Sequence, residues 1–156
     1  MNCVIYAPHP DDEIIGCYEV LKKAPNIIII YGADTDSKRR EEALKLKDQV
    51  ENLTVQLFLN SVPMSMMNKD HIFYFPDPVY ETHPKHREYG MIGESFARNG
   101  FDVTFYNTTM NAPYIHEVGL PSLKNQLLDE IYPSQKDMWK YDHKYFLFEG
   151  YSKWIF

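Results

Sequence analysis

Short apolar runs alternate with amphipathic stretches along this chain of 156 residues. The pattern predicts strands at 2–6, 26–31, 54–59, 71–75 and 102–106, and helices at 12–23, 37–51, 86–99 and 121–132. The run Asn26–Tyr31 is typical of a strand buried on both faces of a parallel sheet, because no polar residue interrupts its isoleucines. Asn99-Gly100 indicates the end of the third helix.

The alternation of strands and helices predicts an α/β fold, a single Rossmann-like three-layer α/β/α domain over residues 1–156. The sheet is expected to be mostly parallel, with about five strands. Segment 60–70 is barely long enough for a parallel crossover, so it is expected to be a bare loop unless the strand order differs. Ligands of such folds bind beyond the carboxyl ends of the strands. The segments after the first, second and fourth strands therefore form the expected functional rim.

Ala7-Pro8-His9-Pro10-Asp11-Asp12-Glu13, directly after the first predicted strand, combines an imidazole with carboxylates. His9 and Asp12 lie three positions apart where a strand turns into a helix, so both side chains can converge on one metal ion. A second motif, His83-Pro84-Lys85-His86, follows the fourth strand and offers His86 as a third ligand. Three protein ligands with one position left for water is the usual arrangement of a catalytic zinc site.

Two further side chains have the chemistry that a hydrolase needs. Asp11, beside the metal ligands, can accept a proton from a water that the metal activates. His83, as an imidazolium across the site, can stabilise an oxyanion and protonate a leaving amine. The two motifs therefore indicate a metal-dependent hydrolase. Zinc is the expected ion, and Fe²⁺ and Co²⁺ suit the same imidazole and carboxylate ligands.

A simpler interpretation of residues 10–13 is a helix start. Pro10 at the first helical position, followed by acidic residues in the first turn, would complement the helix dipole. This interpretation explains the carboxylates, but it explains neither His9 nor the second histidine motif. A Rossmann-like binding domain without a metal is also disfavoured, because no G-x-G-x-x-G loop follows the first strand.

The first motif, continued by Ile14-Ile15-Gly16-Cys17, resembles the opening of the LmbE-like or PIG-L family of zinc-dependent N-acetylglucosaminyl-phosphatidylinositol de-N-acetylases. His83-Pro84-Lys85-His86-Arg87 is similar to the second histidine motif of that family, and Arg39-Arg40-Glu41-Glu42 to its arginine-glutamate helix start. Weaker likenesses are Lys124 and Ser134-Gln135. The resemblance implies a Rossmann-like enzyme that removes acetyl groups from N-acetylated sugars and related amides.

The resemblance implies the same roles for the residues of the two motifs: zinc ligands His9, Asp12 and His86, general base Asp11 and electrophilic histidine His83. It adds Arg39 and Arg40 as contacts for substrate hydroxyls or phosphate. The chain departs from the family at Lys85, where Asp is common, and at Tyr18-Glu19, which replace a glycine pair. The chain is also short for the family, and the insertions that shape the substrate pocket are trimmed.

The expected substrate is therefore a small N-acetylated molecule, sugar-like or nucleoside-like. The trimmed loops leave a second hypothesis, a non-catalytic, metal-containing protein that binds a sugar or a nucleotide. The two hypotheses differ in whether Asp11 and His83 face an open coordination position.

Composition and charge limit the kinds of partner and the cellular compartment that are expected for this chain. A net charge of −6 argues against a general nucleic-acid binder, which needs a basic face. Cys3 and Cys17 are expected to be free, buried thiols in a reducing compartment. No apolar stretch approaches the length of a membrane helix, so the expectation is a cytoplasmic protein without a membrane partner.

The remaining polar and aromatic groups have ordinary structural explanations. Asp34 and Asp36 are expected to cap the helix that begins at 37 rather than to orient a substrate. His116 is expected at the surface, and Met64–Met67 forms either a packed apolar loop or a pocket lid. The aromatic segment 145–151 is expected at the core edge, with a homo-oligomer interface as the alternative.

Overall fold

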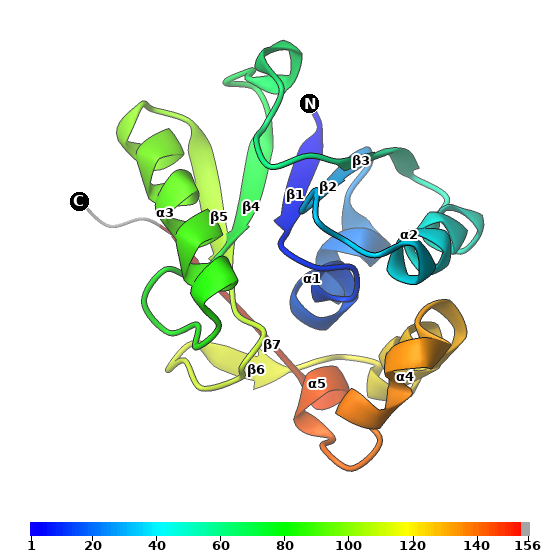
Figure 1. The fold of residues 1–156 in the computed structure, drawn as a ribbon. Coiled ribbons are helices and arrows are strands. Elements are labelled where there is room, and N and C mark those ends of the chain that lie inside the picture. Colours follow the sequence, from blue (N-terminus) through cyan, green and yellow to red (C-terminus); the bar gives the residue numbers. More distant parts are fainter. Residues whose placement is uncertain (154–156) are drawn as a thin grey trace.

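The computed structural model describes residues 1–153, which fold around one seven-stranded sheet (Figure 1). The strands are β1 (Cys3–Ala7), β2 (Ile27–Tyr31), β3 (Leu53–Phe58), β4 (Ile72–Pro76), β5 (Asp102–Tyr106), β6 (Ile115–Glu117) and β7 (Phe148–Lys153). The α-helices are α1 (Asp12–Lys23), α2 (Ser37–Leu44), α3 (Pro84–Arg98), α4 (Pro121–Ile131) and α5 (Lys144–Leu147). Three 3₁₀ helices are η1 (Lys45–Asp48), η2 (Met64–Met66) and η3 (Pro133–Met138).

The sheet has the strand order β3-β2-β1-β4-β5-β7-β6. Strands β1 to β5 are parallel, whereas β7 runs antiparallel to β5, and β6 antiparallel to β7. The α/β class and a mostly parallel central sheet are confirmed, but the expected number of strands is wrong. Strand β6 has only three residues, and Glu149-Gly150 interrupts the apolar pattern of β7, so neither strand has a clear signature in the sequence.

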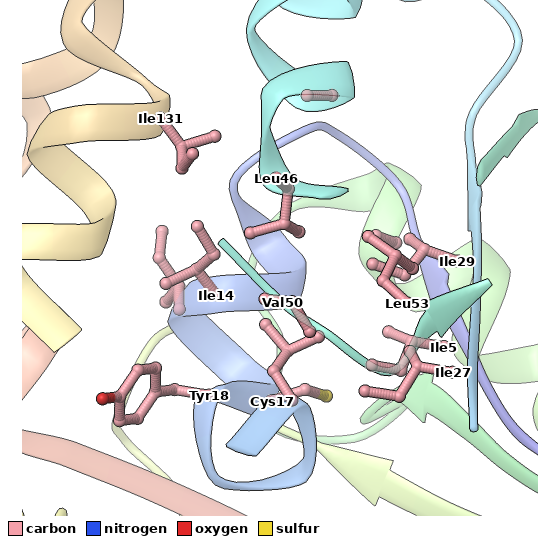
Figure 2. Close-up of a cluster of buried hydrophobic side chains, with 14 of the residues drawn as sticks. Ile5, Ile14, Cys17, Tyr18, Ile27, Ile29, Leu46, Val50, Leu53 and Ile131 are labelled. Atoms are coloured by element: carbon pink, nitrogen blue, oxygen red, sulfur yellow. The ribbon is translucent and has the colours of Figure 1, made fainter. Parts of the chain in front are cut away.

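Alternate side chains of the central strands pack on opposite faces of the sheet, so the strands read as continuous apolar runs. Residues Ile5, Ile27 and Ile29 join the core on one face, beneath α1, α2 and α4, and Figure 2 shows this cluster. Val4 and Ile30 join the core on the other face, beneath α3. The apolar run 27–30 is fully consistent with a strand covered on both sides.

The connection from β3 to β4 is a loop with one 3₁₀ turn, as the short segment 60–70 predicts. It leads from the edge of the sheet back to the strand beside β1. Val62 is buried in the core beneath α3, and Met66 packs against the same core. Met64 is 88% exposed, so of the two alternatives for this methionine segment the structure favours a loop that packs on the body through Met66.

Helix α1 is kinked at Cys17, whose backbone (φ −133°, ψ 25°) leaves the helical region. The buried ion pair between Lys124 and Glu149 lies at this interruption. The Lys124 ammonium donates to the carbonyl oxygen of Ile15 at 2.6 Å, and the backbone N–H of Glu19 donates to the Glu149 carboxylate at 3.2 Å. In an unbroken helix this carbonyl and this N–H would bond to each other. The ion pair therefore replaces one helical hydrogen bond with two bonds to other elements.

Two further expectations can be compared with the fold. Cys3 and Cys17 are free and buried, as predicted. Within residues 1–153, no helix combines the length and the apolar character that crossing a membrane requires.

The close contact between Gly16, next to the kink of α1, and the ring of Tyr106 can be tested by substitution. A Cβ at this position would lie 2.3 Å from Cδ2 of Tyr106, whose buried ring is fixed by a hydrogen bond from its hydroxyl to the carbonyl oxygen of Tyr6. We expect Gly16→Ala to lower the free energy of unfolding by about 1–3 kcal/mol, measured by urea denaturation. Gly119→Ala is the matched control, because a Cβ there meets no atom within 4 Å. Equal stabilities for the two variants would contradict this packing.

Candidate metal centre

The first motif lies in the turn that joins β1 to α1, at the carboxyl end of β1, the middle one of the five parallel strands (Figure 1). The backbone N–H of His9 donates to Asp12 Oδ2 at 2.9 Å, which closes the turn. Asp11 has a positive φ of 117°, an uncommon conformation for a residue other than glycine. The carboxylates of Asp11 and Asp12 are consecutive in the sequence, but only that of Asp12 contacts the two imidazoles.

The second motif begins α3. His83 is the N-cap residue, with its Nδ1 accepting from the backbone N–H of Lys85 at 3.1 Å, and Pro84 is the first helical residue. The helix thus begins two residues earlier than the sequence pattern predicts. His86 falls in the first turn, beside the carboxyl end of β1.

The two motifs meet at three ligand atoms. His9 Nδ1 lies 3.3 Å from His86 Nε2 and 3.5 Å from Asp12 Oδ2, and the last two atoms are 3.1 Å apart. In a tetrahedral zinc site with bonds of about 2.0–2.1 Å, neighbouring ligand atoms are about 3.3 Å apart. The three side chains therefore already form one face of such a tetrahedron and could hold a metal ion.

Electrostatics of the ligand set favour a cation. Burial would raise the pKa of Asp12, but His86 and His9 hold it well below its usual range. Burial lowers the pKa of His86, but Asp12 and Glu81 outweigh it and raise the pKa to about 10. Without a metal, the positive charge between these carboxylates is a proton on His86. A metal ion would supply that charge instead and release the proton on binding.

Asp11 is the group that this charge pattern leaves unsatisfied. Its side chain is only 2% exposed, and Oδ2 has no hydrogen-bond partner. Burial raises its pKa well above the usual range, and the charges of Asp12 and Glu13 add to the rise, while Arg39 opposes it. Asp11 also lines the cavity at the candidate metal position, so its carboxylate has a hydrogen-bonding capacity there that no group of the protein satisfies.

Glu13 is a third buried carboxylate, for which the sequence suggested only a favourable place in the first turn of a helix. Its Oε1 accepts hydrogen bonds from the hydroxyls of Tyr31 and Tyr132, and its Oε2 accepts from the backbone N–H of Asp11 at 2.8 Å. Burial raises its pKa to about 7. Glu13 therefore fixes the backbone of Asp11, and its position in the motif, directly after a candidate base and a candidate ligand, was the only available signal.

His83 faces the same site from the start of α3. Its ring centroid is 5.0 Å from that of His9 and 5.2 Å from that of His86. Burial, with the charges of His86 and His9, lowers the pKa of His83. Because Nδ1 accepts the N–H of Lys85, a neutral His83 carries its proton on Nε2, which is then the donor available to a ligand.

The site opens into a cavity of about 360 Å³, a volume suited to a small molecule. Asp11, His83 and the candidate ligands line it, together with Arg39 and residues from the C-terminal segment such as Lys144. The Arg39 guanidinium donates to Gln135 Oε1, which fixes it at the cavity wall.

Arg40 does not share this position. Its guanidinium donates to the carbonyl oxygens of Ala33 and Thr35 and lies over the ring of Phe58, so it secures the loop after β2. Among the described residues, the cavity is lined by Arg39 but not by Arg40.

Several other expectations are resolved by contacts. Asp36 caps α2 by accepting from the backbone N–H of Arg39, as predicted. His116 is exposed, with Nε2 3.6 Å from a Glu19 oxygen, and it does not line the cavity.

The helix-start interpretation of the first motif is only partly adequate. Asp11 occupies the N-cap position of α1, but its side chain makes no capping hydrogen bond. Asp12 and Glu13 do lie in the first turn, where a negative charge interacts favourably with the helix dipole. Their burial and their contacts with other elements exceed what helix capping requires.

The chain was compared with protein-family models, curated proteins and solved structures. No protein-family model, no curated protein and no solved structure matches the chain.

Metal content gives the first test of the ligand set. We expect the purified chain to contain close to one zinc or iron ion after dialysis, and His86→Ala to lose it, because one face of the tetrahedron is then incomplete. Elemental analysis makes the measurement. His71→Ala is the control, since His71 contacts Asn2 near the amino end of β1. Equal metal content in wild type and His86→Ala, or none in wild type after addition of zinc, would contradict the site.

Proposed function

We propose that the chain is a metal-dependent hydrolase that removes an N-acetyl group from a small, sugar-like or nucleoside-like amide. The observation that carries this proposal is the convergence of His9, Asp12 and His86 beside the unpartnered Oδ2 of Asp11, in an accessible cavity. A metal site built only for stability would be expected to be closed by a fourth protein ligand, whereas a catalytic site keeps a position for water or substrate.

The donor set of two imidazoles and one carboxylate suits zinc, and Fe²⁺ or Co²⁺ would be accepted as well. Such an ion supplies Lewis-acid polarisation of the amide carbonyl and activation of a water molecule. Every other step belongs to side chains of this chain. Asp11 accepts the proton of the attacking water, because it lines the cavity and no hydrogen bond from the protein engages its Oδ2.

His83 supplies the hydrogen bond to the oxyanion that develops when water attacks the carbonyl. With Nδ1 occupied by the N–H of Lys85, its Nε2–H is the donor. This neutral donor replaces the imidazolium that the sequence alone suggested. The proton taken up by Asp11 is then available for the leaving amine, so that the carboxylate returns to its initial state.

Arg39 is the proposed contact for the part of the substrate beyond the amide. It lines the cavity, and among the described residues no carboxylate lies within ion-pair distance of its guanidinium. A forked guanidinium suits hydroxyl pairs or an anionic group. The acetyl amide as substrate rests on the resemblance of the two motifs to the LmbE-like or PIG-L deacetylases.

Asp11→Asn tests the base. Asparagine has the shape of aspartate and, like it, accepts a positive φ more readily than most residues, so the turn should be kept. We expect kcat to fall by about 10²–10⁴-fold on an N-acetylated sugar that the wild type hydrolyses, with the zinc content unchanged. The readout is release of free amine and acetate, followed for both proteins at equal zinc occupancy.

Full activity of the Asp11→Asn variant would assign the base to another group. The non-catalytic alternative has a different outcome. A wild-type chain that binds zinc and a sugar or nucleotide, but hydrolyses none of a panel of N-acetylated sugars and nucleosides, would support a binding protein instead.

A further inference from the structure

We propose that Glu81 and Thr108 are positioning residues of the metal centre, which hold the His86 imidazole in the tautomer and orientation that direct Nε2 to the metal. The inference rests on the proposed metal-dependent function and extends it to two residues outside both sequence motifs. Glu81 lies in the loop between β4 and α3, and Thr108 follows β5.

The two nitrogens of the His86 ring face different groups. Nε2 lies 3.1 Å from Asp12 Oδ2 and therefore points to the candidate ligands. Nδ1 lies 3.2 Å from Thr108 Oγ1 and 3.5 Å from Glu81 Oε2. An imidazole that binds a metal through one nitrogen almost always donates the N–H of the other nitrogen to a carboxylate, a carbonyl or a water molecule.

Thr108 acts as that acceptor because Glu81 takes its only hydroxyl proton. The Thr108 hydroxyl donates to the two oxygens of Glu81 at 2.9 and 3.0 Å, and the backbone N–H of Thr108 donates to Oε1 at 2.6 Å. The lone pairs of Thr108 Oγ1 are then left to accept the Nδ1 proton of His86. The chain imidazole–hydroxyl–carboxylate fixes the proton on Nδ1 and leaves the Nε2 lone pair for the metal.

Burial makes this chain hard to replace. The exposed fractions of Glu81, His86 and Thr108 are 2%, 5% and 7%, so water has little access to substitute for a lost partner. Removing one partner leaves a buried polar group unsatisfied. The carboxylate at the end of the chain also increases the basicity of the metal-binding nitrogen.

Lys85, between the two histidines of the second motif, does not support His86 in place of Glu81 and Thr108. Lys85, where the resembling family commonly has Asp, places its ammonium 3.8 Å from a Glu88 oxygen on the same helix. Support for His86 comes instead from the segments that follow β4 and β5, which are neighbouring strands of the sheet.

Zinc affinity measures the proposed role without relying on activity. Competition with a chromophoric chelator at fixed pH would be applied to the wild type, Glu81→Gln and Thr108→Val. We expect both variants to bind zinc about 10–100-fold more weakly, because both break the hydrogen-bond chain while keeping the side-chain shape. Thr108→Ser keeps the hydroxyl, and we expect it to bind zinc within about twofold of the wild type.

Two further measurements separate positioning from loss of stability. Glu149→Gln also neutralises a fully buried glutamate, but this residue pairs with Lys124 at the α1 kink, so we expect it to lower stability without weakening zinc binding. Nitrogen-15 NMR of the zinc-loaded proteins should show a protonated Nδ1 of His86 in the wild type. In Thr108→Val the same Nδ1 proton should exchange faster with water.

The outcomes distinguish the inference from the proposed function. Wild-type affinity in Glu81→Gln and Thr108→Val, or an equal loss of affinity in Glu149→Gln, would overturn the positioning role and leave the metal centre intact. Weaker zinc binding in the two variants, together with an inactive wild type, would support positioning and refute the hydrolase. A wild type that binds no zinc would overturn both.

Discussion

Three consecutive carboxylates, Asp11, Asp12 and Glu13, must be buried at the carboxyl end of β1, where their exposed fractions are 2%, 4% and 0%. A buried carboxylate is costly unless it is neutralised or hydrogen-bonded, and the turn itself provides only part of the partners, namely the backbone N–H groups of His9 and Asp11 and the imidazole of His9. Asp12 obtains imidazoles, and Glu13 obtains the hydroxyls of Tyr31 and Tyr132. The surroundings of this turn follow from that requirement.

The partners come from segments far apart in the sequence, and the strand order explains how they meet. Strand β1 lies between β2 and β4, so the chain leaves it in opposite directions along the sheet. In open α/β sheets this is the point where a crevice forms beyond the strands. His86 comes from α3, Tyr31 from β2 and Tyr132 from the end of α4. The acidic turn therefore links both halves of the sheet to the C-terminal segment.

The sequence predicts the parts of this arrangement that depend on local pattern. Buried parallel strands have continuous apolar runs, and the spacing of His9, Asp12 and His86 makes their convergence foreseeable once these strands are placed side by side. Glu81 and Thr108 could not be identified, because a carboxylate and a hydroxyl in loops have no periodic signature. Their role depends on the pairing of β4 with β5, which only the three-dimensional structure provides. The same holds for β6 and β7, whose pairing is non-local.

The adjacent carboxylates Asp11 and Asp12 have opposite electrostatic environments. Asp11 lies just outside α1 with a φ of 117°, and Asp12 is the first residue of the helix. Asp12 then faces imidazoles, which lower its pKa, and Asp11 lies in a buried position that raises its pKa. Where neighbouring titratable groups are driven apart in this way, one suits permanent ionisation and the other proton transfer. The turn thus places the proposed ligand Asp12 and the proposed base Asp11 at adjacent positions of one sequence motif.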